Sequence, residues 1–223
     1  MLTAMRERLG VLIAGVALIG VGVVMIGIPL LTHQSDTQSV DTRGNADSAA
    51  LAAWDSGGSD AVKGTGNVHD PTHGDVGGAC VPGAAPADEY ALVQFTSLSY
   101  NYAGVAGDGT WDLLKQRSMV HYQGTPPPGG AGNVIIAFHR EPNYQYIDKL
   151  DHGGVVTIED RSCHTYVYTI QSKVELAPQD VTQLNPTGGH ILTMITCTPF
   201  WVDTDRLVWR GTLTTVDGHP APA

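Results

Sequence analysis

Six short runs of alternating or β-branched residues constrain the fold of this chain most strongly, and all of them follow Asp88. They are Tyr90–Leu98, Asn133–Ala137, Val155–Ile158, Thr165–Val174, His190–Thr196 and Arg206–Val216. Turn-rich pieces such as GTPPPGGAG and NPTGG separate them, and such runs between glycine and proline clusters are typical of strands. The pattern predicts a mainly β domain, built as a closed or nearly closed barrel.

One short helix is expected inside this β domain, at Thr110–Arg117. Thr110 is suited to cap it, and Leu113 and Leu114 would face inward. The 27 glycines and 13 prolines agree with many turns and short elements. The net charge of −10 excludes a broad attraction to nucleic acid.

The amino-terminal part predicts a membrane anchor. Residues Gly10–Leu31 form an uncharged apolar run of 22 residues, long enough for a helix that crosses a bilayer. Arg6 and Arg8 precede this run, so residues 1–9 are expected to be a short cytoplasmic tail. The alternative is a cleaved signal peptide, whose apolar region would be shorter and end at a small-residue site.

Residues 32–86 are expected to form a flexible extracytoplasmic linker, because glycine, serine, aspartate, threonine and alanine dominate them. His69, His73 and Asp75 within it resemble metal ligands only in residue type, since a glycine-rich setting provides no fixed geometry. No metal or cofactor is therefore expected. Residues 87–223 would form the catalytic domain.

Three cysteines raise the question of which one is left over, because extracytoplasmic cysteines tend to pair. Cys197 ends the strand ILTMITC just before a proline, which places its sulfur at a barrel rim. Cys163 is followed by His164, but neighbours on a strand point to opposite faces and are not expected to cooperate. A Cys80–Cys163 disulfide would tie the linker to the barrel.

Basic residues close to Cys197 in sequence favour a reactive thiol over an idle core cysteine. Arg206 and Arg210 are an even number of residues apart and should share one face of their strand. A fixed positive charge favours the thiolate, and arginine also donates to a developing oxyanion. His139 follows a strand and is the preferred partner, while His121 and His164 remain alternatives from the residues alone.

Several motifs, taken in order, resemble the sortases, the cysteine transpeptidases of the Gram-positive cell envelope. The stretch Gly109–Arg140 contains a Gly-Thr helix, a HYxGT segment and a Gly-Asn-Val strand before the histidine. The stretch Ile147–Val156 is similar to the family's turn after that histidine, and Thr193–Gly211 is similar to its TLxTC box and the TCTP continuation. The resemblance covers about Glu89 to Val216 and is closest to classes C, D and E.

The resemblance implies an eight-stranded β-barrel with Cys197 as nucleophile, His139 as the catalytic histidine and Arg206 as the oxyanion-side arginine. It removes His121 from the catalytic set. Phe138 departs from the family's usual glycine before the histidine, and Met194 replaces the usual leucine of TLxTC. A bulky Phe138 would be expected to narrow the cleft or shift peptide preference.

The resemblance also implies a reaction and its partners. A sorting peptide of a surface protein, similar to LPxTG or LAxTG, would be cleaved after threonine and transferred to an amine acceptor such as a peptidoglycan precursor. Without an Asp-Pro-Trp lid motif, a class D or E role is favoured. The alternatives are an L,D-transpeptidase, although its SHGC box is absent, and a non-enzymatic stalked binding domain.

Overall fold

The computed structural model describes residues 48–54, 80–99 and 102–222 of the chain. Within these ranges nine strands form one sheet, in the order β6-β5-β1-β2-β3-β4-β7-β8-β9. The strands are β1 Ala91–Gln94, β2 Ala103–Gly109, β3 Met119–Tyr122, β4 Gly132–Phe138, β5 Val155–Asp160, β6 Thr165–Leu176, β7 His190–Thr198, β8 Asp205–Val216 and β9 His219–Pro220. The same ranges hold the short 3-10 helices η1 Trp111–Lys115, η2 Ile147–Lys149 and η3 Thr182–Leu184.

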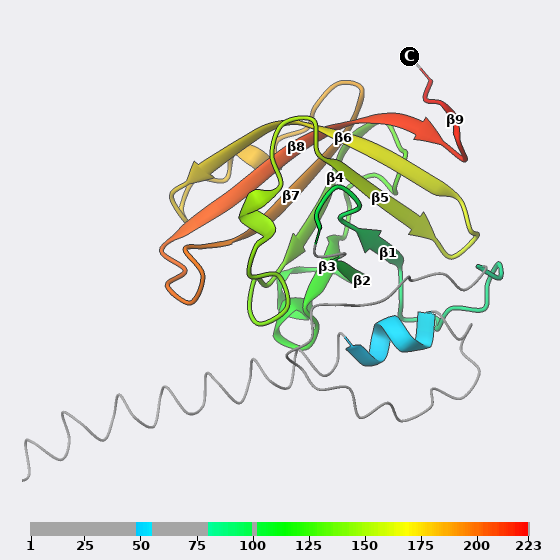
Figure 1. The fold of residues 1–223 in the computed structure, drawn as a ribbon, viewed down its shortest axis with the longest axis horizontal. Coiled ribbons are helices and arrows are strands. Elements are labelled where there is room, and N and C mark those ends of the chain that lie inside the picture. The colour runs from blue at the N-terminus through cyan, green and yellow to red at the C-terminus, as the bar shows by residue number, and fades with distance from the viewer. Residues whose placement is uncertain (1–47, 55–79, 100–101, 223) are drawn as a thin grey trace, which may run out of the picture. The chain divides into compact units, whose positions relative to one another are not determined.

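The sheet closes into a barrel because β6 also pairs with β8 (Figure 1). That pairing is antiparallel and runs from Tyr166↔Val216 to Leu176↔Arg206. Strand β9 only extends β8 as a short hairpin, so the closed barrel has eight strands. The expected mainly β, eight-stranded barrel with a few short helices is thereby confirmed for the described residues.

All six predicted runs form strands, but the sequence analysis missed β2 and β3. Strand β2 reads AGVAGDG and has the glycines of a loop rather than a β-branched pattern. Its Gly104 is required by packing, since a Cβ there would collide with the hydroxyl of Tyr144. That hydroxyl donates a hydrogen bond to the carbonyl oxygen of Ala103 at 3.0 Å.

The barrel interior is filled by large apolar side chains that alternate along the strands. Trp209, Tyr144, Tyr168 and Phe95 are fully buried there. Phe138 joins them, stacked on Trp209 at 6.3 Å and edge-on to Tyr144 at 5.3 Å between ring centroids. On β4, β7 and β8, the residues adjacent to these inward-facing ones point to the outer face of the barrel.

A second apolar cluster covers the outer face of β4, β7 and β8. It consists of the buried Ile135, Ile195 and Val208, with Tyr122, Leu176 and Leu184 packed against them. Buried side chains outside a barrel require a covering segment, and the β6–β7 connection with η3 provides it. Two carbonyls of that connection, Gln183 and Asn185, each accept a hydrogen bond from Asn133 at 3.0 Å.

The predicted helix at Thr110–Arg117 is shorter and less buried than expected. It is a single 3-10 helix, η1, and Thr110 makes no side-chain cap hydrogen bond. Leu113 and Leu114 are half-buried rather than part of the core. The capping prediction was therefore wrong. The two leucines do face the barrel, since Leu113 packs against Gly107 and Gly109 of β2, but a helix this short on the barrel surface does not bury them fully.

Part of the expected linker packs against the barrel. Residues 48–54 form a helix whose Leu51 and Trp54 are buried against Ala85, Leu92 and Val105. The Trp54 indole donates a hydrogen bond to the Glu159 carboxylate on β5 at 3.1 Å.

Residues 1–31, with the predicted cytoplasmic tail and anchor, lie outside the described residues, as does the histidine-rich segment that includes His69. In the described ranges no helix is long and apolar enough to cross a membrane.

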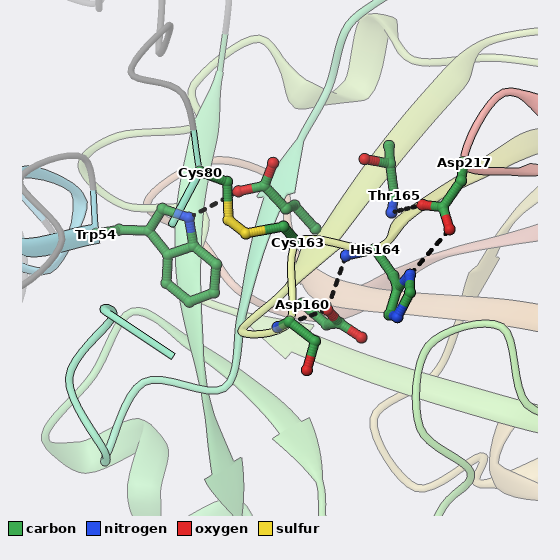
Figure 2. Close-up of a disulfide and its surroundings, with 9 residues drawn as sticks. Trp54, Cys80, Asp160, Cys163, His164, Thr165 and Asp217 are labelled. Carbon is green, nitrogen blue, oxygen red and sulfur yellow. Dashed lines mark hydrogen bonds and ion pairs between the residues drawn. A yellow bond between two sulfur atoms is a disulfide. The ribbon is translucent and has the colours of Figure 1, made fainter. Parts of the chain in front are cut away.

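The predicted Cys80–Cys163 disulfide is present, with the two Cα atoms 5.7 Å apart (Figure 2). Cys163 lies in the turn between β5 and β6, with φ at +67°, and not on a strand as the sequence analysis assumed. His164 faces away to form an ion pair with Asp217 at 2.8 Å. The two neighbours therefore do not cooperate, although the reason is the turn rather than strand alternation.

Candidate active site

A groove of about 380 Å³ lies on the outer face of the barrel, over the outer apolar cluster. Its floor comes from β4 and β7, and its walls come from η1 and the β6–β7 connection. The lining residues are Trp111, Leu114, Ala137, Phe138, His139, Pro178, Val181, Gln183, Leu184, Ile195, Thr196, Cys197 and Arg206. All three residues predicted to be catalytic are among them.

Cys197 reaches the groove because of its position on β7. It shares the outer face with Ile195, two residues earlier, and the strand ends one residue later at Thr198. Its side chain is half-buried, and it is the free cysteine of the described residues. The sulfur is thus at a strand end, as predicted, but on the outer wall of the barrel.

Arg206 lies directly opposite Cys197 across the antiparallel β7–β8 pair. Side chains of such directly opposed residues share a face, with Cβ atoms about 5 Å apart. Its Nη1 donates to the carbonyl oxygens of Asp205 at 3.0 Å and Asp203 at 3.3 Å, which holds the side chain at the start of β8. Arg210 lies on the same face but pairs with Thr193 and Ser172 and does not line the groove.

His139 follows β4 and is held by η1 and the segment after it. Its backbone N–H donates to the Ser118 carbonyl at 2.8 Å, and its Nε2 lies 2.8 Å from the Leu114 carbonyl. A carbonyl accepts only, so Nε2 carries a proton, and Nδ1 is the basic nitrogen of the neutral ring.

The two other histidines considered lie elsewhere. His121 is buried between Asp108 at 2.9 Å and the Pro126 carbonyl at 2.9 Å, and it stacks on Tyr90. His164 is exposed and paired with Asp217. Neither lines the groove, so of these three histidines the structure places only His139 in the groove with Cys197.

Phe138 does not narrow the groove as the sequence analysis expected. Its side chain is 3% exposed, and its ring packs in the barrel interior against Trp209. The residue borders the groove, and its carbonyl accepts a hydrogen bond from the buried Thr196 hydroxyl at 2.7 Å. Strand alternation turns the aromatic ring away from His139.

The environment of Cys197 opposes ionisation more than the sequence implied. Burial raises the pKa of the Cys197 thiol above its ordinary value, while Arg206 lowers it and Asp203 and Glu141 raise it. Burial disfavours the charged thiolate, and here it outweighs the neighbouring guanidinium. In the free protein the sulfur is therefore held mainly as a thiol at neutral pH.

This balance predicts how Cys197 reacts with iodoacetamide as the pH changes. The alkylation rate should rise with pH and follow an apparent pKa above that of an ordinary thiol, because only the thiolate reacts. Arg206→Ala should move this apparent pKa higher and slow labelling at a fixed pH. A labelling rate that is indifferent to Arg206→Ala would contradict the electrostatic contact.

Sequence reasoning missed several residues that shape the groove. Pro178, Val181 and Leu184 belong to a polar connection with no strand or helix period. Their placement depends on Asn133, which is buried and whose Oδ1 accepts from the Thr193 hydroxyl at 2.6 Å. A polar residue at the start of the strand GNVIIAF, directly before its apolar residues, was the signal available, because a buried amide needs partners.

Comparison with known proteins identifies the family. The sequence profile of the Sortase domain matches residues 94–214, which is more than half of the chain. The chain belongs to the sortase family. Sortases are cysteine transpeptidases, so the chain is an enzyme of that type, and the L,D-transpeptidase and binding-domain alternatives are set aside. No curated protein matches this chain.

Solved sortase structures share the barrel. The Sortase D5 transpeptidase from Clostridium perfringens is 28% identical, with a TM-score of 0.51, over 57% of this chain and 80% of its own. Sortase E from Streptomyces avermitilis is 25% identical, with a TM-score of 0.51, over 60% of this chain and 95% of its own. Sortase C1 from Streptococcus agalactiae is 26% identical, with a TM-score of 0.52, over 58% of this chain and 69% of its own. The similar sortases thus include members of classes C, D and E.

Proposed function

We propose that this sortase cleaves an LPxTG-like or LAxTG-like sorting peptide after its threonine and transfers the new carboxyl end to an amine acceptor of the cell wall. The observation that carries the proposal is the meeting of Cys197, His139 and Arg206 in one groove. A nucleophile, a proton carrier and a fixed cation are the groups that acyl transfer from an amide requires.

In the first half-reaction, the Cys197 thiol gives its proton to Nδ1 of His139, and its sulfur attacks the threonine carbonyl carbon and forms a C–S bond. Negative charge develops on the carbonyl oxygen, and Arg206, across the strand pair, is placed to donate to it. The C–N bond to the next residue then breaks. His139 supplies the proton that lets the amine leave, and a thioacyl enzyme remains.

The second half-reaction reverses the roles. An acceptor amine attacks the thioester carbonyl, His139 accepts the proton lost by the amine, and the C–S bond breaks as His139 returns that proton to the sulfur. The Leu114 carbonyl, 2.8 Å from Nε2, supports this cycle because it keeps the proton on that nitrogen. Proton exchange with the reacting groups is then left to Nδ1.

The groove also supports an apolar, extended substrate. Ile195, Leu184 and Val181 offer apolar surface beside the cysteine, which suits the leucine of a sorting peptide. The proposed setting is the outer surface of the membrane, with Gly10–Leu31 as the anchor and the amino terminus in the cytoplasm. Sorting-signal peptides of surface proteins would be the substrates and a peptidoglycan precursor the acceptor.

A small peptide panel tests this function. LPxTG-like and LAxTG-like peptides are incubated with the protein and a defined amine, and products are identified by mass spectrometry. We expect cleavage between threonine and glycine, and a transfer product that contains the amine. A peptide with the threonine and glycine exchanged is the control. Absence of cleavage at that bond in every peptide would overturn the proposal.

A further inference from the structure

Two residues that directly follow His139 contact the turn that directly follows Cys197. Arg140 and Glu141 are both 5% exposed, although each carries a charge. The turn consists of residues 199–204 and connects β7 to β8. Buried charged groups need partners. Arg140 finds one of them at the end of β7, and Glu141 finds one in the turn.

Arg140 is held at several points. Its Nη2 donates to Asp148 Oδ1 at 2.7 Å and to the Gln145 carbonyl at 2.9 Å. Its Nη1 donates to the hydroxyl of Thr198, the residue after the cysteine, at 3.2 Å. The guanidinium carbon also lies 5.6 Å from the centre of the Phe200 ring, and Phe200 in turn packs edge-on against Trp201.

Glu141 makes the more specific contact. Its Oε1 accepts a hydrogen bond from the backbone N–H of Trp201 at 2.8 Å. Trp201 has φ at +64° and Asp203 has φ at +60°, a conformation that residues other than glycine rarely adopt. Such backbone persists only where surrounding contacts fix it. Within the turn, the backbone N–H groups of Val202 and Asp203 both donate to the Pro199 carbonyl.

We propose that Arg140 and Glu141 are positioning residues that fix the β7–β8 turn, and with it Cys197 and Arg206, relative to His139. This inference rests on the proposed transfer reaction and adds two residues that do not line the groove. Cys197 precedes the turn and Arg206 follows it, so a shift of the turn displaces both. A displacement of about 1 Å from a reacting geometry can lower a rate about 100-fold.

Charge alone could also couple Glu141 to the site, since Glu141, Asp203 and Arg206 all act on the Cys197 thiol. Glu141 itself has a pKa raised by burial, with Trp201 and Arg140 lowering it and Asp203 raising it. Two substitutions separate these effects. Glu141→Gln removes the charge but keeps an oxygen acceptor for Trp201, whereas Glu141→Ala removes both.

The test measures turnover and amide hydrogen exchange in the full chain. For Glu141→Ala we expect kcat for peptide cleavage to fall about 10- to 100-fold with KM nearly unchanged, and exchange across residues 200–203 to accelerate. Glu141→Gln should keep kcat and the exchange rate of residues 200–203 close to their wild-type values. Thr198→Val, which removes the hydroxyl that accepts from Nη1 of Arg140, should also lower kcat. Glu159→Ala, which deletes the acceptor of Trp54 outside the groove, is the matched control and should leave kcat unchanged.

The outcomes separate the contact from its role. Unchanged exchange in Glu141→Ala would overturn the contact, and accelerated exchange with unchanged kcat would overturn the positioning role. Equal losses of kcat in Glu141→Gln and Glu141→Ala would also overturn the positioning role, because the loss of the carboxylate charge would then explain the effect. A wild-type protein that cleaves no sorting peptide would overturn the proposed function and the positioning role together, while the exchange result would still report on the contact.

Discussion

Cys197→Ala is expected to abolish peptide cleavage and transfer while the barrel stays folded. The substitution removes the atom that would form the thioacyl bond, and no other free thiol exists in the described residues to replace it. The side chain is half-buried on the outer face of β7, so losing one sulfur atom should reduce the free energy of unfolding by only about 1 kcal/mol. Peptide cleavage followed by chromatography, with circular dichroism on the same sample, measures both effects.

Cys197→Ser is a useful companion because it keeps the shape of the side chain. A hydroxyl is a far weaker nucleophile than a thiolate near neutral pH, so this variant should also be inactive and equally folded. Turnover retained in Cys197→Ala would remove this residue from the reaction.

Arg206→Ala is expected to lower kcat about 100-fold or more. Loss of a single oxyanion donor has effects of this size, because the donor acts on charge that appears only in the transition state. The register Cys197↔Arg206 places the guanidinium on the same face as the sulfur. Separate determination of kcat and KM with a sorting peptide measures the effect, and a loss confined to KM would argue against the role.

Arg210→Ala provides the matched control for Arg206. The two arginines share a strand and a face, but Arg210 does not line the groove. Its substitution should leave kcat nearly unchanged. Equal losses in the two variants would indicate a general effect of positive charge on this face rather than a contact with the reacting carbonyl.

The barrel was predictable where strands carried an alternating or β-branched pattern. Strands β1 and β4 to β8 lie in runs with such a pattern, and closure followed from the number and spacing of these runs. Strand β2 was not predictable, because Gly104 serves the packing of Tyr144, a contact 40 residues away in sequence. Strand β3 reads MVHY, with a single β-branched residue and no alternation of apolar and polar residues, so it carries no such pattern.

The three site residues could be selected from motifs, but their environment could not. The sequence shows Arg206 close to Cys197 and so favours a thiolate, whereas burial of the sulfur outweighs that charge. Burial depends on the β6–β7 connection, which Asn133 holds over the groove through two carbonyls. Such long-range contacts are set by tertiary structure and leave little trace in a local pattern.

The contact between Glu141 and the Trp201 amide was equally invisible in sequence. The two residues are 60 positions apart, and the contact exists because β4 and β7 run parallel and end on the same side of the barrel. Motifs therefore identified the reacting groups, and the strand arrangement determines what holds them together.

Direct capture of the acyl-enzyme is the most decisive measurement. The protein is mixed with a sorting peptide, quenched in acid within the first turnover, and digested for mass spectrometry. We expect the segment that contains Cys197 to carry the amino-terminal part of the peptide, ending in threonine and joined through sulfur, and to lose it when an amine is added. Cleaved peptide with an unmodified Cys197, or an acyl group on another residue, would contradict the account.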